Sequence, residues 1–205
     1  MNAQLKRLLK APAYRVYRRA LLSVNNGSRS ELLQEMPKNA ICAEIGVWKG
    51  AFSEAILAMT QPAQLHLVDP WAFADSHPRR LYGGVGARNQ YDMDAIASDV
   101  RAKFAADSRV VIHRITSQEF FATCEPESFY WVYIDGDHSA SAVLADLRGA
   151  WRAVRPSGII AGDDYFWRDD EGSLGVRRGV RQFSRETAAP FRRLGSQFIF
   201  AKPAA

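Results

Sequence analysis

The sequence predicts one α/β domain with a parallel, doubly wound sheet, preceded by a short helical extension. Short apolar runs alternate with helical patterns from residue 39 onward, which is the pattern of strands crossed over by helices. The 205 residues are 47% hydrophobic and 24% charged, so the chain can bury a core without disulfides. We therefore expect an extension at 1–38 and the α/β domain at 39–205, with no internal repeat.

The extension is predicted from apolar residues at helical spacing with basic residues between them. Asn25-Asn26-Gly27 interrupts this pattern, and a short helix at 29–35 follows. The extension has two interpretations. It is either a helical cap on the edge of the domain or a basic amphipathic surface that meets a membrane, a lipid-linked substrate or a second subunit.

The domain itself is predicted element by element from its apolar runs. Five runs read as strands, at 40–45, 64–68, 109–113, 129–134 and 158–161. Helical patterns lie between them at 51–59, 91–106, 117–123 and 139–154, and a further helix is expected at 176–186. Residues 191–194 and 198–202 flank Gly195-Ser196, which predicts a closing antiparallel hairpin.

The net charge of +5 is unevenly distributed along the chain. Residues 1–38 hold eight Lys and Arg against two Asp and Glu, and residues 168–205 hold eight against four. The middle, 39–167, is acidic, with eleven against sixteen. A domain that binds nucleic acid through its core should not have an acidic core, so no nucleic-acid partner is expected.

The compartment is predicted from what the chain lacks. Cys42 and Cys124 are too few for a disulfide framework, and no run approaches the ~20 apolar residues of a membrane span. Basic residues interrupt any signal-peptide core at the N-terminus. We expect a cytoplasmic protein, with contact to the inner face of the membrane through residues 1–28 left open.

The first two strands end in residues suited to a nucleotide-like ligand. Glu44, Gly46 and Gly50 form an E-x-G-x-x-x-G turn that leads into a helix, and Asp69 ends the second strand in LHLVDPW. Glycines allow close approach to the backbone, and an acid at the second strand can bind a ribose diol. A plain strand-to-helix turn and a turn-forming Asp-Pro are the alternatives. Together the two features favour an adenosyl ligand.

Acidic residues gather after the fourth and fifth strands. VYIDGDH and GIIAGDDY supply Asp135, Asp137, His138, Asp163 and Asp164 at one end of neighbouring strands. Crowded carboxylates repel each other unless a cation neutralises them, and their oxygens suit Mg²⁺, Ca²⁺ or Mn²⁺. The alternative, a turn or helix-capping role, fits Asp137 and Asp163. His138 could take a proton from a substrate, or have no catalytic role.

These residues also carry a family resemblance. The strings AEIGVWKG, LHLVDPW, ITSQEFF, WVYIDGDHSASAVLADL and VRPSGIIAGDDY resemble class I S-adenosylmethionine-dependent methyltransferases. They resemble most the bacterial branch with DGDH and GDDY motifs, related to macrocin and aminocoumarin sugar O-methyltransferases and distantly to catechol O-methyltransferase. The match covers about 39–202. It implies a Rossmann-like sheet of seven strands, the last antiparallel.

The resemblance also implies roles for single residues. Asp69 would hold the ribose hydroxyls, and Ser117 and Gln118 would contact adenine. His138 stands where the catechol enzyme has a catalytic lysine, so the base stays open between His138 and Asp137. The methionine part of the cofactor would be surrounded by Glu44, Gly46, Trp48 and Gly50, with Asp135 also at the cofactor, and Mg²⁺ would be held by Asp135, Asp163 and Asp164.

The expected function is a metal-dependent O-methyltransferase that uses S-adenosylmethionine and Mg²⁺ or another divalent cation. Its acceptor would be a hydroxyl of a sugar, glycan, glycolipid or similar vicinal diol, with Asp135, Asp137 and His138 as the catalytic residues. Alternatives are a methyltransferase that acts on RNA and a non-catalytic adenosyl-binding subunit. An NAD-dependent oxidoreductase is a further alternative, although the glycine spacing differs from that of a dinucleotide-binding motif. A homo-oligomer stays open.

Overall fold

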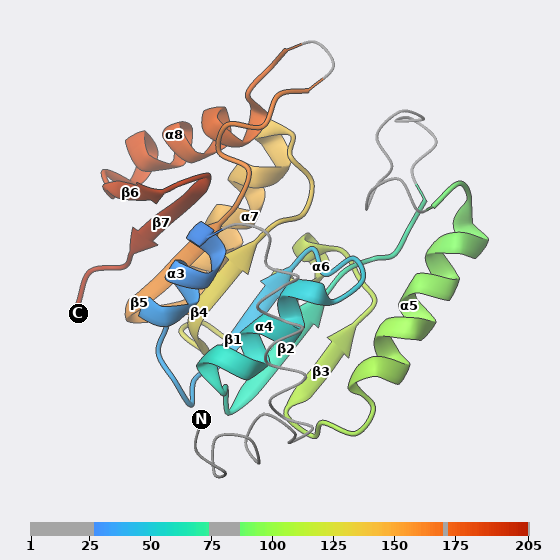
Figure 1. Ribbon diagram of the computed structural model, residues 1–205. Coiled ribbons are helices and arrows are strands. Elements are labelled where there is room, and N and C mark those ends of the chain that lie inside the picture. The colour runs from blue at the N-terminus through green and yellow to red at the C-terminus, as the bar shows by residue number, and fades with distance from the viewer. Residues whose placement is uncertain (1–26, 74–86, 170–171, 205) are drawn as a thin grey trace, which may run out of the picture.

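A computed structural model describes residues 27–73, 87–169 and 172–204 of the chain. Its centre is a seven-stranded sheet with the order β3-β2-β1-β4-β5-β7-β6 (Figure 1). The first five strands are parallel, and β7 runs antiparallel to both β5 and β6. The predicted doubly wound, Rossmann-like sheet with an antiparallel last strand is therefore confirmed.

The elements follow the apolar runs closely. The parallel strands are β1 (Ile41–Ile45), β2 (Gln64–Val68), β3 (Val110–His113), β4 (Phe129–Ile134) and β5 (Val154–Gly162). The helices are α3 (Gly27–Glu35), α4 (Ala51–Thr60), α5 (Gln90–Phe104), α6 (Ser117–Thr123), α7 (Ala140–Ala153) and α8 (Gly175–Thr187). The antiparallel hairpin is β6 (Phe191–Leu194) and β7 (Gln197–Ala201).

The helices form two layers, one on each face of the sheet. One apolar cluster joins α3, α4 and α5 to the sheet, and a second joins α6, α7 and α8 to the opposite face. Both faces of the parallel strands are thereby buried, which is why those strands are nearly continuous apolar runs. The strand order reverses between β1 and β4, and open α/β sheets bind ligands at the carboxyl ends of the strands at such a point.

The fifth strand begins earlier than the expected 158–161. Val154 pairs with Phe129 at the start of β4, directly after α7 ends. Ser157 then adopts a left-handed φ of 61°, and its N–H donates to the carbonyls of Lys202 and Pro203. This irregularity lets the strand continue through Pro-Ser-Gly, residues that look like a turn in the sequence.

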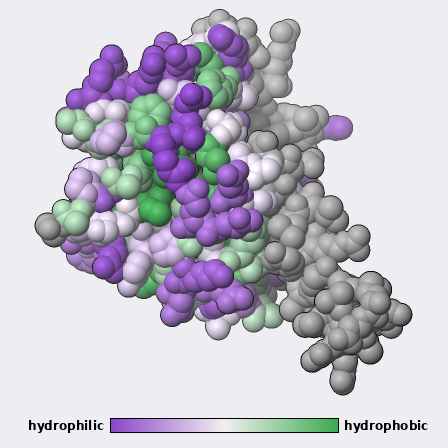
Figure 2. Space-filling model, turned by 60° about the vertical axis from the view of Figure 1, so that its left-hand side comes forward, coloured by the Kyte–Doolittle hydropathy of each residue, from purple (hydrophilic) through white to green (hydrophobic). Residues whose placement is uncertain are grey.

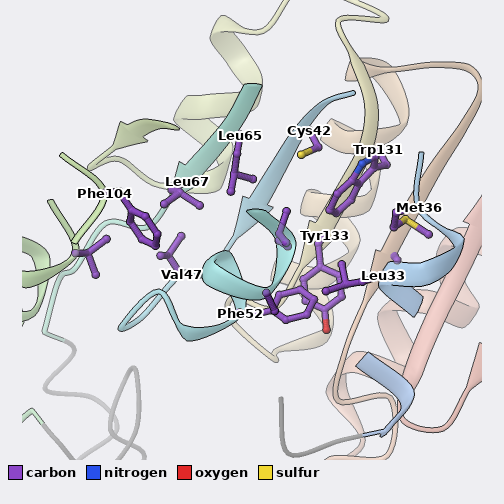
Figure 3. Packing of buried hydrophobic residues seen from close by; sticks show 14 of the residues in the cluster. Leu33, Met36, Cys42, Val47, Phe52, Leu65, Leu67, Phe104, Trp131 and Tyr133 are labelled. Atoms are coloured by element: carbon purple, nitrogen blue, oxygen red, sulfur yellow. The ribbon is translucent and has the colours of Figure 1, made fainter. Parts of the chain in front are cut away.

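Helix α3 packs into the core of the domain. Leu33 and Met36 point toward Tyr133 and Trp131 of β4, with Phe52 of α4 alongside (Figure 3). These side chains are at most 6% exposed. The last part of the 1–38 extension therefore shares the core of the 39–205 domain, whereas residues 1–26 lie outside the described residues.

The surface of the molecule at helix α8 and the β6–β7 hairpin is polar. Helix α8 buries Val176, Val180 and Phe183 against the domain and turns arginines outward on its other side. Hydrophilic side chains dominate the molecular face on which this edge comes forward, around a small hydrophobic area (Figure 2). This edge is thus a charged surface above an apolar core.

Candidate functional site

The turn after β1 passes directly over the end of β4. Gly46 has a φ of +86°, and its N–H donates to the carbonyl of Val68 at 2.9 Å. A Cβ at this position would lie 2.1 Å from the carbonyl oxygen of Asp135, which no side chain can accommodate. The glycine is therefore needed because the turn packs closely against the backbone of β4, whereas the sequence predicted a close approach of a ligand, which stays a prediction.

Asp69 holds this turn in place. Its Oδ2 accepts hydrogen bonds from the N–H groups of Val47 and Trp48 at 3.0 and 2.9 Å, and its Oδ1 accepts from Trp71 at 2.8 Å. Its side chain thus joins the turns that follow β1 and β2. A carboxylate can accept about four hydrogen bonds, so Oδ1 retains capacity for one more donor.

Glu44 lies beneath the turn, fully buried. Burial raises the pKa of Glu44 to about 8, and the negative charges of Asp135 and Asp69 act in the same direction. The hydroxyl of Ser53 donates to its Oε2 at 2.5 Å and offsets part of the rise. At neutral pH Glu44 is therefore mainly a neutral carboxylic acid, which can donate as well as accept.

A pocket of about 220 Å³ opens where the turns after β1, β2 and β4 meet α6 and α7. Ser117 and Gln118 begin α6, whose end is fixed by a capping box between Thr116 and Glu119. Of the predicted site residues, the pocket brings together Gly46, Ser117, Gln118 and Asp137. Glu44, Trp48, Gly50, Asp69 and Asp135 are not in its lining.

The acids after β4 and β5 meet at the same end of the sheet. Nε2 of His138 lies 3.7 Å from Oδ1 of Asp135 and 3.4 Å from Oδ2 of Asp164. The three side chains offer ligand atoms within 4.8 Å of one another. Two carboxylates and an imidazole therefore form a donor group that suits a divalent cation.

Asp163 is held apart from this group by other partners. Its Oδ2 accepts from Nε of Arg29 at 2.5 Å, and its Oδ1 accepts from the Ser196 hydroxyl at 2.5 Å and the Asp164 N–H at 2.7 Å. Arg29 also donates from Nη2 to Oδ2 of Asp135 at 2.7 Å. A guanidinium from α3 thus bridges two of the three predicted metal ligands.

These contacts shift the pKa values of the two aspartates after β5 in opposite directions. Burial alone would raise the pKa of Asp163, but the charge of Arg29 and the Ser196 hydrogen bond hold it below its ordinary value. For Asp164, burial and the charge of Asp135 raise the pKa to about 6. Burial would lower the pKa of His138, yet its proximity to Asp135 and the charge of Asp164 raise it.

Asp137 lies at the edge of the pocket and is exposed. Its Oδ1 accepts from the N–H of Ser139 at 2.7 Å, and the Ser139 hydroxyl in turn caps α7. Asp137 therefore stabilises the turn before α7, which is one of the two roles that the sequence left open for it. Because one oxygen makes this bond, the other can still face a ligand.

Two residues of this site were not predicted. Arg29 follows a turn in a basic stretch, and no local pattern connects it with acids more than 100 residues away. Asp146 lines the pocket and is 2% exposed. The sequence could have indicated Asp146, because it lies on the same apolar face of α7 as Val143, Leu147 and Ala150. A carboxylate on a buried helix face needs an explanation.

Many solved structures resemble the chain in fold, and three of them serve as examples. A protein from Corynebacterium glutamicum shares 12% identity over 98% of this chain and 97% of its own, with a TM-score of 0.60. The O-methyltransferase NovP shares 16% over 86% and 80%, with a TM-score of 0.56. An O-methyltransferase family protein from Burkholderia thailandensis shares 10% over 94% and 57%, also at 0.56. At such low identities these similarities establish the fold alone.

Curated proteins gave no significant match to the sequence. Among the described residues, every helix is too short or too polar to cross a bilayer. Residues 43–165, which include the glycine turn, the pocket and the acid group, match a family described as a methyltransferase domain. The chain belongs to this methyltransferase domain family, which implies S-adenosylmethionine as its methyl donor.

Proposed function

We propose that the protein is an O-methyltransferase that acts on a vicinal diol, such as a sugar hydroxyl of a glycan or glycolipid, with the help of a divalent cation. The observation that carries the proposal is the group of Asp135, His138 and Asp164 beside the pocket under the glycine turn. Two adjacent oxygens of a diol can chelate one cation, which favours such an acceptor over an isolated alcohol.

The donor set fits a cation, with one change from the sequence-based expectation. Asp135, His138 and Asp164 would hold the ion, because their ligand atoms lie within 4.8 Å of one another and Asp163 is not part of this group. An imidazole in the set suits Mn²⁺ and other transition metals better than Mg²⁺, which prefers oxygen ligands alone. When bound, the ion would lower the pKa of the acceptor hydroxyl.

The protein contributes mainly position and charge. S-adenosylmethionine, when bound, supplies the electrophilic methyl group. The glycine turn, fixed by Asp69, would position the donor, and Oδ1 of Asp69 can accept one ribose hydroxyl. Asp137 is a suitable proton acceptor, since it lies at the pocket but outside the group that would hold the cation. If no cation binds, His138 takes that role.

The direct test is transfer of a labelled methyl group from S-adenosylmethionine to a panel of sugar nucleotides, glycolipids and catechols, with Mg²⁺ or Mn²⁺. We expect label in a diol acceptor, loss of transfer in EDTA, and recovery on adding Mn²⁺. Asp164→Asn should reduce transfer by about 100-fold, whereas Asp99→Asn, the same change on the exposed face of α5, should not. Full activity in EDTA and in Asp164→Asn would overturn the cation part.

The RNA-directed alternative differs in its expected salt dependence. Binding through several phosphate contacts should weaken by orders of magnitude between low and physiological salt. Exposed Arg178, Arg181 and Arg185 on α8 are the observation that favours this alternative. Label found in RNA, with binding that weakens on replacing these arginines by Gln, would replace the diol proposal.

A further inference from the structure

Arg193 on β6 carries an exposed positive charge that two aromatic rings hold in place. Its guanidinium carbon lies 5.6 Å from the ring centre of Tyr165 and 5.0 Å from that of Phe166. Tyr165 is 4% exposed and Phe166 is 49% exposed, so one ring belongs to the core and the other to the surface. Among the described residues, no carboxylate pairs with Arg193. The guanidinium is therefore both fixed in position and available to an anion.

The register of the sheet places Arg193 near the acid site. Arg193 pairs with Phe198 of β7, and Phe198 pairs with Gly162 at the end of β5. Neighbouring strands lie about 4.8 Å apart, so the backbone of Arg193 is about 10 Å from that of Gly162. The chain continues from Gly162 through Asp163 and Asp164 into the two rings that contact the guanidinium.

Hydrogen bonds join the hairpin turn to the segment after β5. The N–H of Tyr165 donates to the carbonyl of Ser196 at 3.0 Å, and the hydroxyl of Ser196 donates to Oδ1 of Asp163 at 2.5 Å. Asp164 lies between these two contacts and has a left-handed φ of 61°. Because Arg193 comes just before this turn, the same bonds fix its position relative to Asp164.

The position of Arg193 favours a phosphate as its anion. A guanidinium stacked on a ring keeps its N–H groups in its own plane, where they donate to two oxygens of a phosphate at once. A phosphate ester projects farther from a sugar ring than the carboxylate of a uronic acid, because an oxygen atom links it to the ring. With the diol at the cation, a phosphate on the other side of the sugar spans the ~10 Å toward Arg193.

On the proposed function as its basis, we propose that Arg193 binds a phosphate of the acceptor, so that the substrate is a sugar that carries a phosphate ester. Arg193 is then a specificity-determining residue for the acceptor, and Phe166 holds its guanidinium toward the ligand. A nucleoside diphosphate sugar and a lipid-linked sugar phosphate share this chemistry.

Transfer of a labelled methyl group, with Mn²⁺ present, tests this assignment on matched acceptors. The panel contains free hexoses, their 1-phosphates, their nucleoside diphosphate and polyprenyl phosphate conjugates, the uronic acids and a catechol. The wild-type kcat/KM should be about 10- to 100-fold higher for a phosphorylated sugar than for the same free sugar. In Arg193→Gln this preference should fall by about tenfold, mainly through a higher KM, because the phosphate takes no part in the reaction.

Arg192→Gln is the matched control for Arg193→Gln. Arg192 is the preceding residue on β6 and is also exposed, but it pairs with Glu35 of α3, so its replacement should keep the wild-type preference. The ratio of two acceptors measured on one variant cancels any loss of folded protein. Preferential labelling of the nucleotide conjugate or of the lipid conjugate supports the proposal and identifies the source of the phosphate.

The contrary outcomes are distinct from one another. Equal wild-type kcat/KM for free and phosphorylated sugars overturns the proposal without any variant, and so does label that enters only uronic acids or only the catechol. An unchanged preference in Arg193→Gln overturns the role of this residue. Absence of label in every acceptor contradicts the proposed function itself.

Discussion

Arg29 gives the acid site a positive charge of its own. Its guanidinium binds Asp163 and Asp135 at once, and it also lies 5.2 Å from the ring centre of Phe52. A cation that enters the site meets carboxylates that are already partly neutralised. Arg29 therefore sets how strongly the site attracts further positive charge.

Replacing Arg29 by Gln should increase the affinity for Mn²⁺ by about tenfold, because Asp135 and Asp163 lose a neighbouring positive charge. Titration followed by the electron paramagnetic resonance of free Mn²⁺ measures this change. Arg29→Lys keeps the charge and should stay near the wild-type value. Arg192→Gln removes an exposed arginine that pairs with Glu35 and should have no effect. An unchanged affinity in Arg29→Gln would contradict the role of this charge.

Glu44 should make stability depend on pH. Its pKa is raised to about 8 in the folded protein, against about 4.3 in an unfolded chain. Between these values the folded state binds more protons at this group, so the contribution of Glu44 to stability is largest below pH 4 and is lost as pH rises toward 8. Glu44→Gln removes this loss, and its stability relative to wild type should rise with pH across this window.

Urea unfolding at pH 5, 6, 7 and 8 measures the effect of Glu44. The wild-type slope attributable to this one group is at most about 1.4 kcal/mol per pH unit. Glu125→Gln, the same change on an exposed side chain, should follow the wild-type profile. Parallel profiles for wild type and Glu44→Gln would show that Glu44 titrates normally.

At the scale of single residues, sequence patterns could show which types occur at strand ends but not how they pair. The ends of β1, β2, β4 and β5 were predicted, and with them Gly46, Asp69, Asp135 and Asp164. The partnership of Asp163 with Arg29 and Ser196 depends on how three distant segments pack. No local pattern carries that information, so which acids remain free to bind a cation follows only from the structure.

At the scale of elements, the turn between β1 and α4 is the most constrained segment of the site. Gly46→Ala would place a Cβ against the backbone carbonyl of Asp135 and force a left-handed φ on alanine. We expect a loss of about 2–5 kcal/mol in unfolding free energy, measured by urea denaturation.

Gly136 provides the matched control for that substitution. It lies directly beside Gly46, and a Cβ there would meet its nearest neighbours at 3.8 and 3.9 Å, an ordinary contact distance. Gly136→Ala should therefore cost less than about 1 kcal/mol. Similar losses for both variants would show that the close approach of Gly46 to β4 is not what stabilises the turn.

The elements were predictable because their signals are local. Alternating apolar runs and helical patterns located the parallel strands, and the turn at Gly195-Ser196 located the hairpin. The start of β5 was misplaced, since the left-handed Ser157 is stabilised by carbonyls of residues 202 and 203 at the other end of the sequence. Local patterns thus fail where distant backbone completes the hydrogen bonding.

At the scale of the whole molecule, the charge distribution sets an expectation for membranes. Residues 1–26 contain six Lys and Arg and no acid. Full-length protein should float with vesicles rich in phosphatidylglycerol at low salt and less at 0.5 M salt. Flotation should be lost when those six residues are replaced by Gln: Lys6, Arg7, Lys10, Arg15, Arg18 and Arg19.

The basic face of α8 supplies the control for this experiment. Replacing Arg178, Arg181 and Arg185 by Gln removes exposed positive charge from another part of the molecule and should leave flotation unchanged. If this variant stops floating and the N-terminal variant does not, α8 is the membrane-facing surface. Absence of flotation for the wild-type protein would contradict a peripheral membrane contact.

The antiparallel hairpin also affects the order in which the site is completed during synthesis. Every residue that lines the pocket lies between Ile45 and Asp146 and is therefore synthesised before the hairpin. Asp163 receives its Ser196 hydrogen bond only when the β6–β7 turn has emerged. Synthesis therefore supplies every residue of the pocket before it supplies the last hydrogen-bond partner of the acid site.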